Sequence, residues 1–202
     1  FVFFFFFLLS RCATIPQTKR NLLSISASIF DPLGLIAPVT AKIKTIFQLL
    51  CKDKLNWDDV IPNKIALIWN KFVDELKNLG EVRHSRFIFT ANFFSGMHVE
   101  LHGFCDSSKE LYCAVVYLRT VCSGSVHVRL LASKTKVAPL KSLTIPRLEL
   151  LGCLILSKLI NDVRVGLKNR VEFKGCIMLD GFRSCSLLDQ WKRKKLGALG
   201  RK

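Results

Sequence analysis

The chain has 202 residues, of which 50% are hydrophobic and 23% are charged. This composition excludes an intrinsically disordered chain and is sufficient for one ordinary domain, or for a small domain plus part of another. Lys and Arg outnumber Asp and Glu by 31 to 15, which gives a formal net charge of +16. Such an excess favours a polyanionic partner, nucleic acid before a membrane surface, although many basic domains merely stay soluble this way.

Cysteine usage and the first residues bear on the compartment. The eight cysteines are scattered without the spacing of a zinc ligand set, so we expect a reduced, intracellular protein, in cytoplasm or nucleus. The segment 1–10 is almost pure Phe and Leu, yet it is shorter than the ~20 apolar residues that span a bilayer. It also lacks the features of a good signal peptide. We interpret it as an artefactual N-terminus, with a damaged signal or anchor as the alternative.

Helical periodicity dominates from Asn21 to Gly80. Apolar residues recur at three- and four-residue steps over Pro38–Leu50, which predicts an amphipathic helix with proline in its first turn. A second apolar stripe predicts a helix over Pro62–Leu79, with Gly80 as its cap. The sequence Asp31–Gly34 (DPLG) is typical of a turn, because proline fixes φ and glycine allows a positive φ. No catalytic cluster is apparent in this stretch.

After about Phe87 the periodicity becomes twofold, which indicates strands. Short joints between the first three strands favour antiparallel hairpins. A helix that is apolar nearly all round follows from Thr144, and we interpret it as buried. Three antiparallel strands, a crossover helix and a further strand predict an α/β fold with a mixed sheet. The predicted strands are His98–Asp106, Leu111–Leu118, Val126–Ala132 and Gly175–Leu179.

Three carboxylates have unusually apolar surroundings. Asp106 and Asp180 each end an apolar strand, and Glu149 lies within the apolar helix. A buried acid needs a partner, a raised pKa or a metal ion. If the strands are neighbours and the helix packs over them, the three carboxylates can converge and bind Mg²⁺, which prefers oxygen ligands. Alternatively, the strand-end acids simply cap the turns that follow them.

Two other sets of polar residues could be either binding sites or ordinary solvated surface. His98, Glu100 and His102 share one strand face and could imitate a zinc site, but such alternation is far more often a solvated face. A basic stretch could contact nucleic-acid phosphates or could simply be a solvated loop. Its members are Lys134, Lys136, Lys141 and Arg147.

Several stretches resemble those of one retroelement family. The segments 29–39 (IFDPLGLIAPV) and 55–58 (LNWD) resemble the region after the reverse-transcriptase core of BEL/Pao retrotransposon polyproteins. The segment 102–108 (HGFCDSS) is similar to the first strand of that family's ribonuclease H domain. The segments 133–140 (SKTKVAPL) and 143–150 (LTIPRLEL) are similar to its next signature. The order and spacing match over most of the chain, and this combination is highly specific.

The resemblance implies that Asp106 and Glu149 occupy the first two acidic metal-ligand positions of the ribonuclease H fold, with Asp180 as the third. The family continues from that third Asp with Ser and an apolar helix that reaches a Trp. This chain continues with Gly181, and its Trp191 arrives later. The family's fourth acidic position is expected beyond the last residue of this sequence.

The resemblance also divides the chain and implies an activity. We expect an unrelated N-terminus (1–20), a helical segment like the reverse-transcriptase thumb or connection (21–90), an incomplete ribonuclease H-like domain (91–191) and a basic tail (192–202). The parent activity would be Mg²⁺- or Mn²⁺-dependent hydrolysis of RNA in RNA–DNA hybrids, and it would be weak or absent here. The alternatives are a non-catalytic nucleic-acid-binding remnant and a non-functional transposon relic. Other parts of a polyprotein are possible partners, whereas a small-molecule cofactor and a membrane are not expected.

Overall fold

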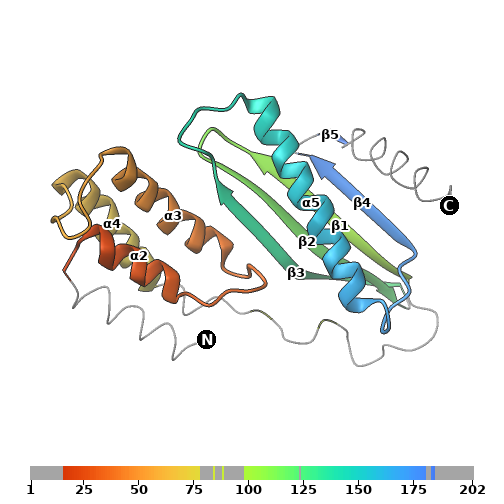
Figure 1. The fold of residues 1–202 in the computed structure, drawn as a ribbon. Helices are drawn as coiled ribbons and strands as arrows, with labels where there is room; N and C mark the ends of the chain where they lie inside the picture. Colours follow the sequence, from red (N-terminus) through yellow and green to blue (C-terminus); the bar gives the residue numbers. More distant parts are fainter. Residues whose placement is uncertain are drawn as a thin grey trace. The chain divides into compact units, whose positions relative to one another are not determined.

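The structure, a computed structural model, describes residues 16–77, 84, 88, 98–122, 124–180 and 183–184. Within these residues the chain forms two compact units, each with its own hydrophobic core (Figure 1). The first unit contains three helices and the short stretch Pro139–Lys141. The second contains a sheet, one helix and the loop Leu33–Leu35. No helix among the described residues is both long enough and apolar enough to cross a membrane.

Three helices build the first unit: α2 (Lys19–Ser28), α3 (Ala37–Lys52) and α4 (Asn63–Leu76). The hydroxyl of Thr18 caps α2 by accepting a hydrogen bond from the Asn21 N–H at 3.3 Å. The apolar stripes of the three helices meet in one core, because each helix buries the side chains that recur along one face. The most buried members are Leu22, Ile43, Ile46, Leu50, Trp69 and Phe72.

The helices α3 and α4 confirm the two predicted helices, including the proline in the first turn of α3. Helix α4 runs to Leu76 in the described residues, and the predicted last residue Leu79 and cap Gly80 lie outside them. Helix α2 was not predicted as a separate element. It buries only Leu22 and Ile25, so its apolar periodicity is too weak to recognise in the sequence.

The sheet has the strand order β3-β2-β1-β4-β5. Strand β1 pairs antiparallel with β2, which pairs antiparallel with β3, and β1 pairs parallel with β4. This arrangement confirms the predicted mixed sheet, although β2 and β3 are longer than predicted. The strands are β1 (His98–Ser107), β2 (Leu111–Cys122), β3 (Ser125–Val137), β4 (Gly175–Asp180) and β5 (Arg183–Ser184).

The outer edge of β3 is held by the loop Leu33–Leu35. The Ser133 N–H donates to the Leu33 carbonyl at 2.7 Å, and the Ser133 hydroxyl donates to the Gly34 carbonyl. Gly34 has φ of +71°, as its place in the DPLG turn predicts. A Cβ atom there would lie 2.0 Å from the Ser133 carbonyl oxygen. We call this contact the β3 clasp.

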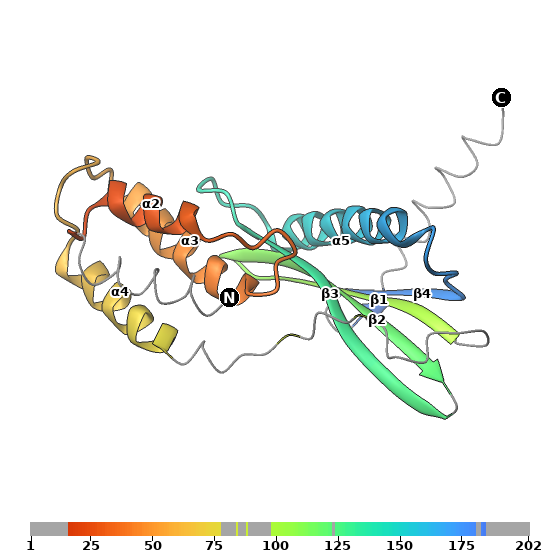
Figure 2. The ribbon, with the colours of Figure 1, turned by 90° about the horizontal axis from the view of Figure 1, so that it is seen from below.

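Helix α5 (Ile145–Leu167) lies across one face of the sheet (Figure 2). It begins after Thr144 with a proline in its first turn, as predicted. Its inner side packs on alternate residues of β1 and β2, and the fully buried side chains there are Leu101, Val116, Leu118 and Leu156.

The prediction that this helix is buried is wrong for its outer side. Leu150 is 53% exposed, Leu154 is 41% exposed and Val165 is 66% exposed. Apolar residues therefore continue around the helix onto a side that the described residues leave exposed. The interpretations of segments 1–10 and 192–202 concern residues outside the described part of the chain.

Candidate functional site

Helix α5 approaches strand β1 closely because two glycines face the contact. A Cβ atom on Gly103 would lie 2.6 Å from Ile160 Cδ1 and 2.7 Å from Leu156 Cδ1, so a larger residue would require the ends of these side chains to shift. On the helix, a Cβ atom on Gly152 would lie 3.0 Å from the Ser107 hydroxyl oxygen. Small residues on both elements therefore allow α5 to pack closely on β1.

A hydrogen bond ties the two elements at the predicted carboxylates. The Ser107 hydroxyl donates to the Leu148 carbonyl at 2.9 Å. Asp106 precedes one partner of this bond and Glu149 follows the other, so both lie at the same end of the β1–α5 pair. One carboxylate oxygen of Asp106 accepts a hydrogen bond from the Ser107 N–H at 2.8 Å.

The expected burial of Glu149 is corrected by the structure. Both Glu149 and Asp106 are exposed to solvent. The argument from a buried acid therefore no longer supports a metal site. What supports one instead is that Asp106 and Glu149 lie at the same end of the β1–α5 pair and are both accessible, because carboxylates are the ligands that hard divalent cations prefer.

The backbone of Asp180 lies at the end of β4, the parallel neighbour of β1. In the strand register Asp180 pairs with Cys105, one residue before Asp106. The chain thus brings Asp106, Glu149 and the backbone of Asp180 to one end of the sheet. The described side chains contain no group of three His, Cys, Asp or Glu residues arranged to hold a metal ion, and the side chain of Asp180 is not among those described.

The thiol of Cys113 lies beside this end of β1. Cys113 pairs with Asp106 in the register of β1 and β2, and its thiol donates to the Asp106 carbonyl at 3.7 Å. Burial raises the pKa of the Cys113 thiol, so the thiol stays protonated at neutral pH. The hydrogen bond ties the Cys113 thiol to the backbone of Asp106.

The four predicted phosphate-contacting residues are exposed and come from three different parts of the chain. Lys134 and Lys136 lie on β3, and Arg147 lies in the first turn of α5. Lys141 belongs to the stretch Pro139–Lys141 of the first unit.

The residues His98, Glu100 and His102 on β1, which could imitate a zinc site, belong to an ion-pair cluster. The Glu100 carboxylate accepts hydrogen bonds from His102 Nε2 and Arg119 Nη1, each at 2.9 Å, and His98 Nδ1 lies 3.5 Å away. The hydrogen bond from His102, followed by that from Arg119, lowers the pKa of Glu100 below its ordinary value. Arg119 comes from β2, so the sequence of β1 alone could not reveal this arrangement.

Sequence reasoning also missed the contacts that position the site. The roles of Ser107 and Gly152 depend on how α5 packs on β1, and neither role follows from periodicity. A weak signal was present, because Gly152 interrupts a run of large apolar residues where a helix former is expected.

A comparison with known protein families identifies the family of this chain. The sequence matches the family described as the Pao retrotransposon-like RNaseH-like domain over residues 18–178. The chain belongs to this family. The Pao match covers most of the chain and includes Asp106 and Glu149. No curated protein matches the sequence.

Proposed function

We propose that this Pao RNaseH-like chain is a metal-dependent nuclease unit that hydrolyses the RNA strand of RNA–DNA hybrids. The observation that carries the proposal is the shared position of Asp106 and Glu149 at the hydrogen-bonded end of β1 and α5. The family match supports a retroelement origin and a ribonuclease H-like fold.

Asp106, Glu149 and Asp180 would hold the metal ion, Mg²⁺ or Mn²⁺. The donor set fits such a cation, because carboxylate oxygens are the ligands that hard divalent cations prefer and the two described carboxylates are accessible. When bound, divalent cations of this kind activate water and stabilise the leaving oxygen of a phosphodiester.

The chain's own residues would supply position and charge. Packing at Gly103 and Gly152, together with the bond from Ser107 to Leu148, holds the two carboxylate-bearing elements in place. The exposed cations Lys134, Lys136, Lys141 and Arg147 would contact backbone phosphates, which positions a substrate without reading its sequence.

The test is cleavage of a labelled RNA–DNA hybrid by the purified chain with Mg²⁺ or Mn²⁺. We expect Asp106→Asn to reduce cleavage at least about a hundredfold, because even outer-shell changes at metal sites cost about tenfold to a hundredfold. Asp162→Asn is the matched control, since Asp162 is exposed on α5 away from the site. Thermal unfolding checks that both variants fold.

Two outcomes would contradict the proposal. Cleavage that does not need a divalent metal, or that survives Asp106→Asn, would exclude this site. A folded chain that binds the hybrid without cleaving it would favour the non-catalytic nucleic-acid-binding remnant.

A further inference from the structure

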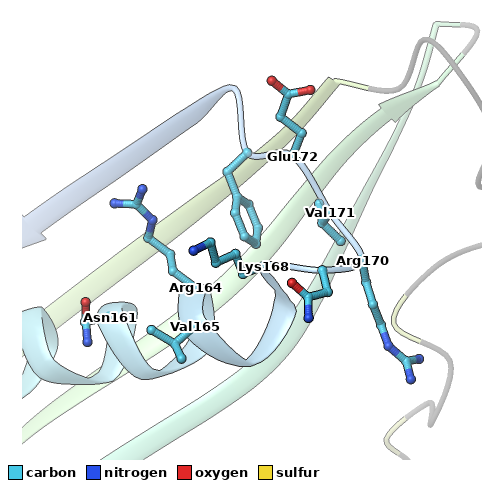
Figure 3. Close-up of a pocket in the computed structure, with 9 residues that line it drawn as sticks. Asn161, Arg164, Val165, Lys168, Arg170, Val171 and Glu172 are labelled. Carbon is cyan, nitrogen blue, oxygen red and sulfur yellow. The ribbon is translucent and has the colours of Figure 1, made fainter.

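An open pocket lies at the other end of α5 from Glu149. It has a volume of about 700 Å³ and is formed by the last turns of α5 and the loop that leads to β4. Its apolar part is made by Val165, Val171 and Phe173. Figure 3 shows Arg164 and Lys168 extending from the helix side of this pocket.

The polar lining is predominantly cationic. Arg164, Lys168 and Arg170 are all exposed, and Glu172 is the one carboxylate in the lining. None of the ion pairs among the described residues involves any of these three cations. Within the described part of the chain, no ion pair neutralises their charge, which favours an external anion as partner. Elsewhere exposed cations do pair, as Arg20 does with Asp58 at 2.7 Å.

We propose that this pocket binds the phosphodiester backbone of a nucleic-acid duplex, as a second contact remote from the carboxylate site. The proposal rests on the proposed function for its choice of ligand. Arg can grip phosphate oxygens with two parallel hydrogen bonds, and Lys adds a flexible point charge. The apolar residues Val165 and Phe173 can accommodate the sugar between two phosphates.

The spacing of the two sites favours a duplex over a free phosphate ion. Glu149 and Lys168 are separated by about 28 Å along α5 at the usual rise per residue. This length corresponds to about eight base pairs of a duplex. Around the helix axis Arg164 lies about 60° and Lys168 about 100° from Glu149, so one duplex running along this side of α5 can reach both ends.

The proposal is tested by binding of a labelled RNA–DNA hybrid of about 20 base pairs to the full chain, measured in EDTA across a series of salt concentrations. We expect the charge-reversal variant Lys168→Glu/Arg170→Glu to lose at least about tenfold in affinity. Its slope of log K against log salt should fall by about two, one for each phosphate contact removed. Lys168→Arg/Arg170→Lys, which keeps both charges, should bind nearly like the wild type.

The matched control is Lys44→Glu/Lys64→Glu, which changes the net charge equally at exposed positions of the helical unit. An equal loss in this control would overturn the proposal, because it would mean that only total charge matters. Unchanged hybrid binding by the pocket variant would also overturn it. Binding of the same variants to vesicles that contain phosphatidylserine is measured in parallel. A loss of vesicle binding with unchanged hybrid binding would overturn the proposal, because the pocket would then be a lipid site.

This experiment is independent of catalysis because it contains no divalent metal. A selective loss of binding in the pocket variant supports the pocket even if the wild-type chain never cleaves the hybrid. If the wild type cleaves and the pocket variant binds normally, the proposed function stands and the pocket proposal fails.

Discussion

Glu100 illustrates how one carboxylate can organise a polar sheet face. It is 18% exposed and is bonded to His102 on its own strand and to Arg119 on β2. A solvated face would not need such pairing. The cluster stabilises the β1–β2 pair through charge-assisted hydrogen bonds, which are stronger than neutral ones.

This cluster gives a pH-dependent prediction. The folded pKa of Glu100 is lowered, so its carboxylate contributes stability above the ordinary value of 4.5, and that contribution is lost as the pH falls through the folded pKa. We expect the stability difference between wild type and Glu100→Gln to be largest near neutral pH and to shrink below about pH 4.5. Urea unfolding at several pH values measures it.

The control for this prediction is Glu110→Gln, which removes the same charge from an exposed residue of the β1–β2 turn. If the wild-type advantage over Glu100→Gln instead increased on acidification, the ion-pair account of this cluster would be wrong. His98, His102 and Arg119 all lie near this carboxylate, so His102→Asn provides a second variant that weakens the same contact.

Among the elements, β3 has the most vulnerable position, because it forms an edge of the described sheet. Unpaired strand edges can pair with other chains, and proteins usually protect them. Here the β3 clasp covers Ser133, and Lys134 and Lys136 place charges further along the strand.

The clasp depends on Gly34, which gives a second prediction. Gly34→Ala should destabilise the chain because alanine disfavours a φ of +71° and its Cβ would collide with the Ser133 carbonyl. Gly124→Ala is the control, since Gly124 has a φ of +79° but nothing within 4 Å of the added Cβ.

We expect the free energy of unfolding to fall by at least about 1 kcal/mol more for Gly34→Ala than for Gly124→Ala. Denaturant unfolding of both variants measures the difference. Equal losses would mean that backbone conformation alone accounts for the effect and that the clasp adds nothing.

The elements also show what the sequence can and cannot predict. The alternation of apolar residues predicts strand β1, and the proline predicts where helix α5 begins, because both features depend on local sequence. The order of these predicted strands and this helix then predicts the mixed sheet. The outer side of α5 could not be predicted, since Leu150 and Leu154 are as apolar as the residues that face the core. The end of β3 was missed because Lys134 and Lys136 read as a loop, whereas an edge strand accommodates them.

Some features of the candidate site could likewise be predicted from the sequence, and others could not. The positions of Asp106 and Glu149 follow from strand and helix patterns and from the family resemblance. The Ser107–Leu148 bond and the glycine contacts require knowledge of which elements pack together. The cationic pocket was missed because its lysine and arginines are spread over a helix end and a loop, where no motif marks them.

At the scale of the whole molecule, the two units have separate cores with no residue in common. Leu156 is fully buried in the core of the sheet unit, whereas Leu154 on the same helix is 41% exposed. A change at Leu156 should therefore affect one unit only, because additivity holds for sites that share no partners.

The third prediction concerns this independence. Leu156→Ala should reduce the stability of the sheet unit by about 2–5 kcal/mol, and Leu154→Ala should have a much smaller effect. Hydrogen exchange followed by mass spectrometry should show faster exchange in peptides from β1, β2 and α5 of the Leu156→Ala variant. Peptides from α3 and α4 should be unchanged, and faster exchange there would show that the units unfold together.

The parallel pairing of β1 with β4 has a consequence for the order of folding. Strands β1, β2 and β3 follow one another directly, so their hairpins can form as soon as they leave the ribosome. The fourth strand is synthesised only after α5, and joining it to β1 closes a long loop. During synthesis one edge of β1 therefore remains unpaired until β4 is made. Nascent chains are most prone to misassociate during this interval.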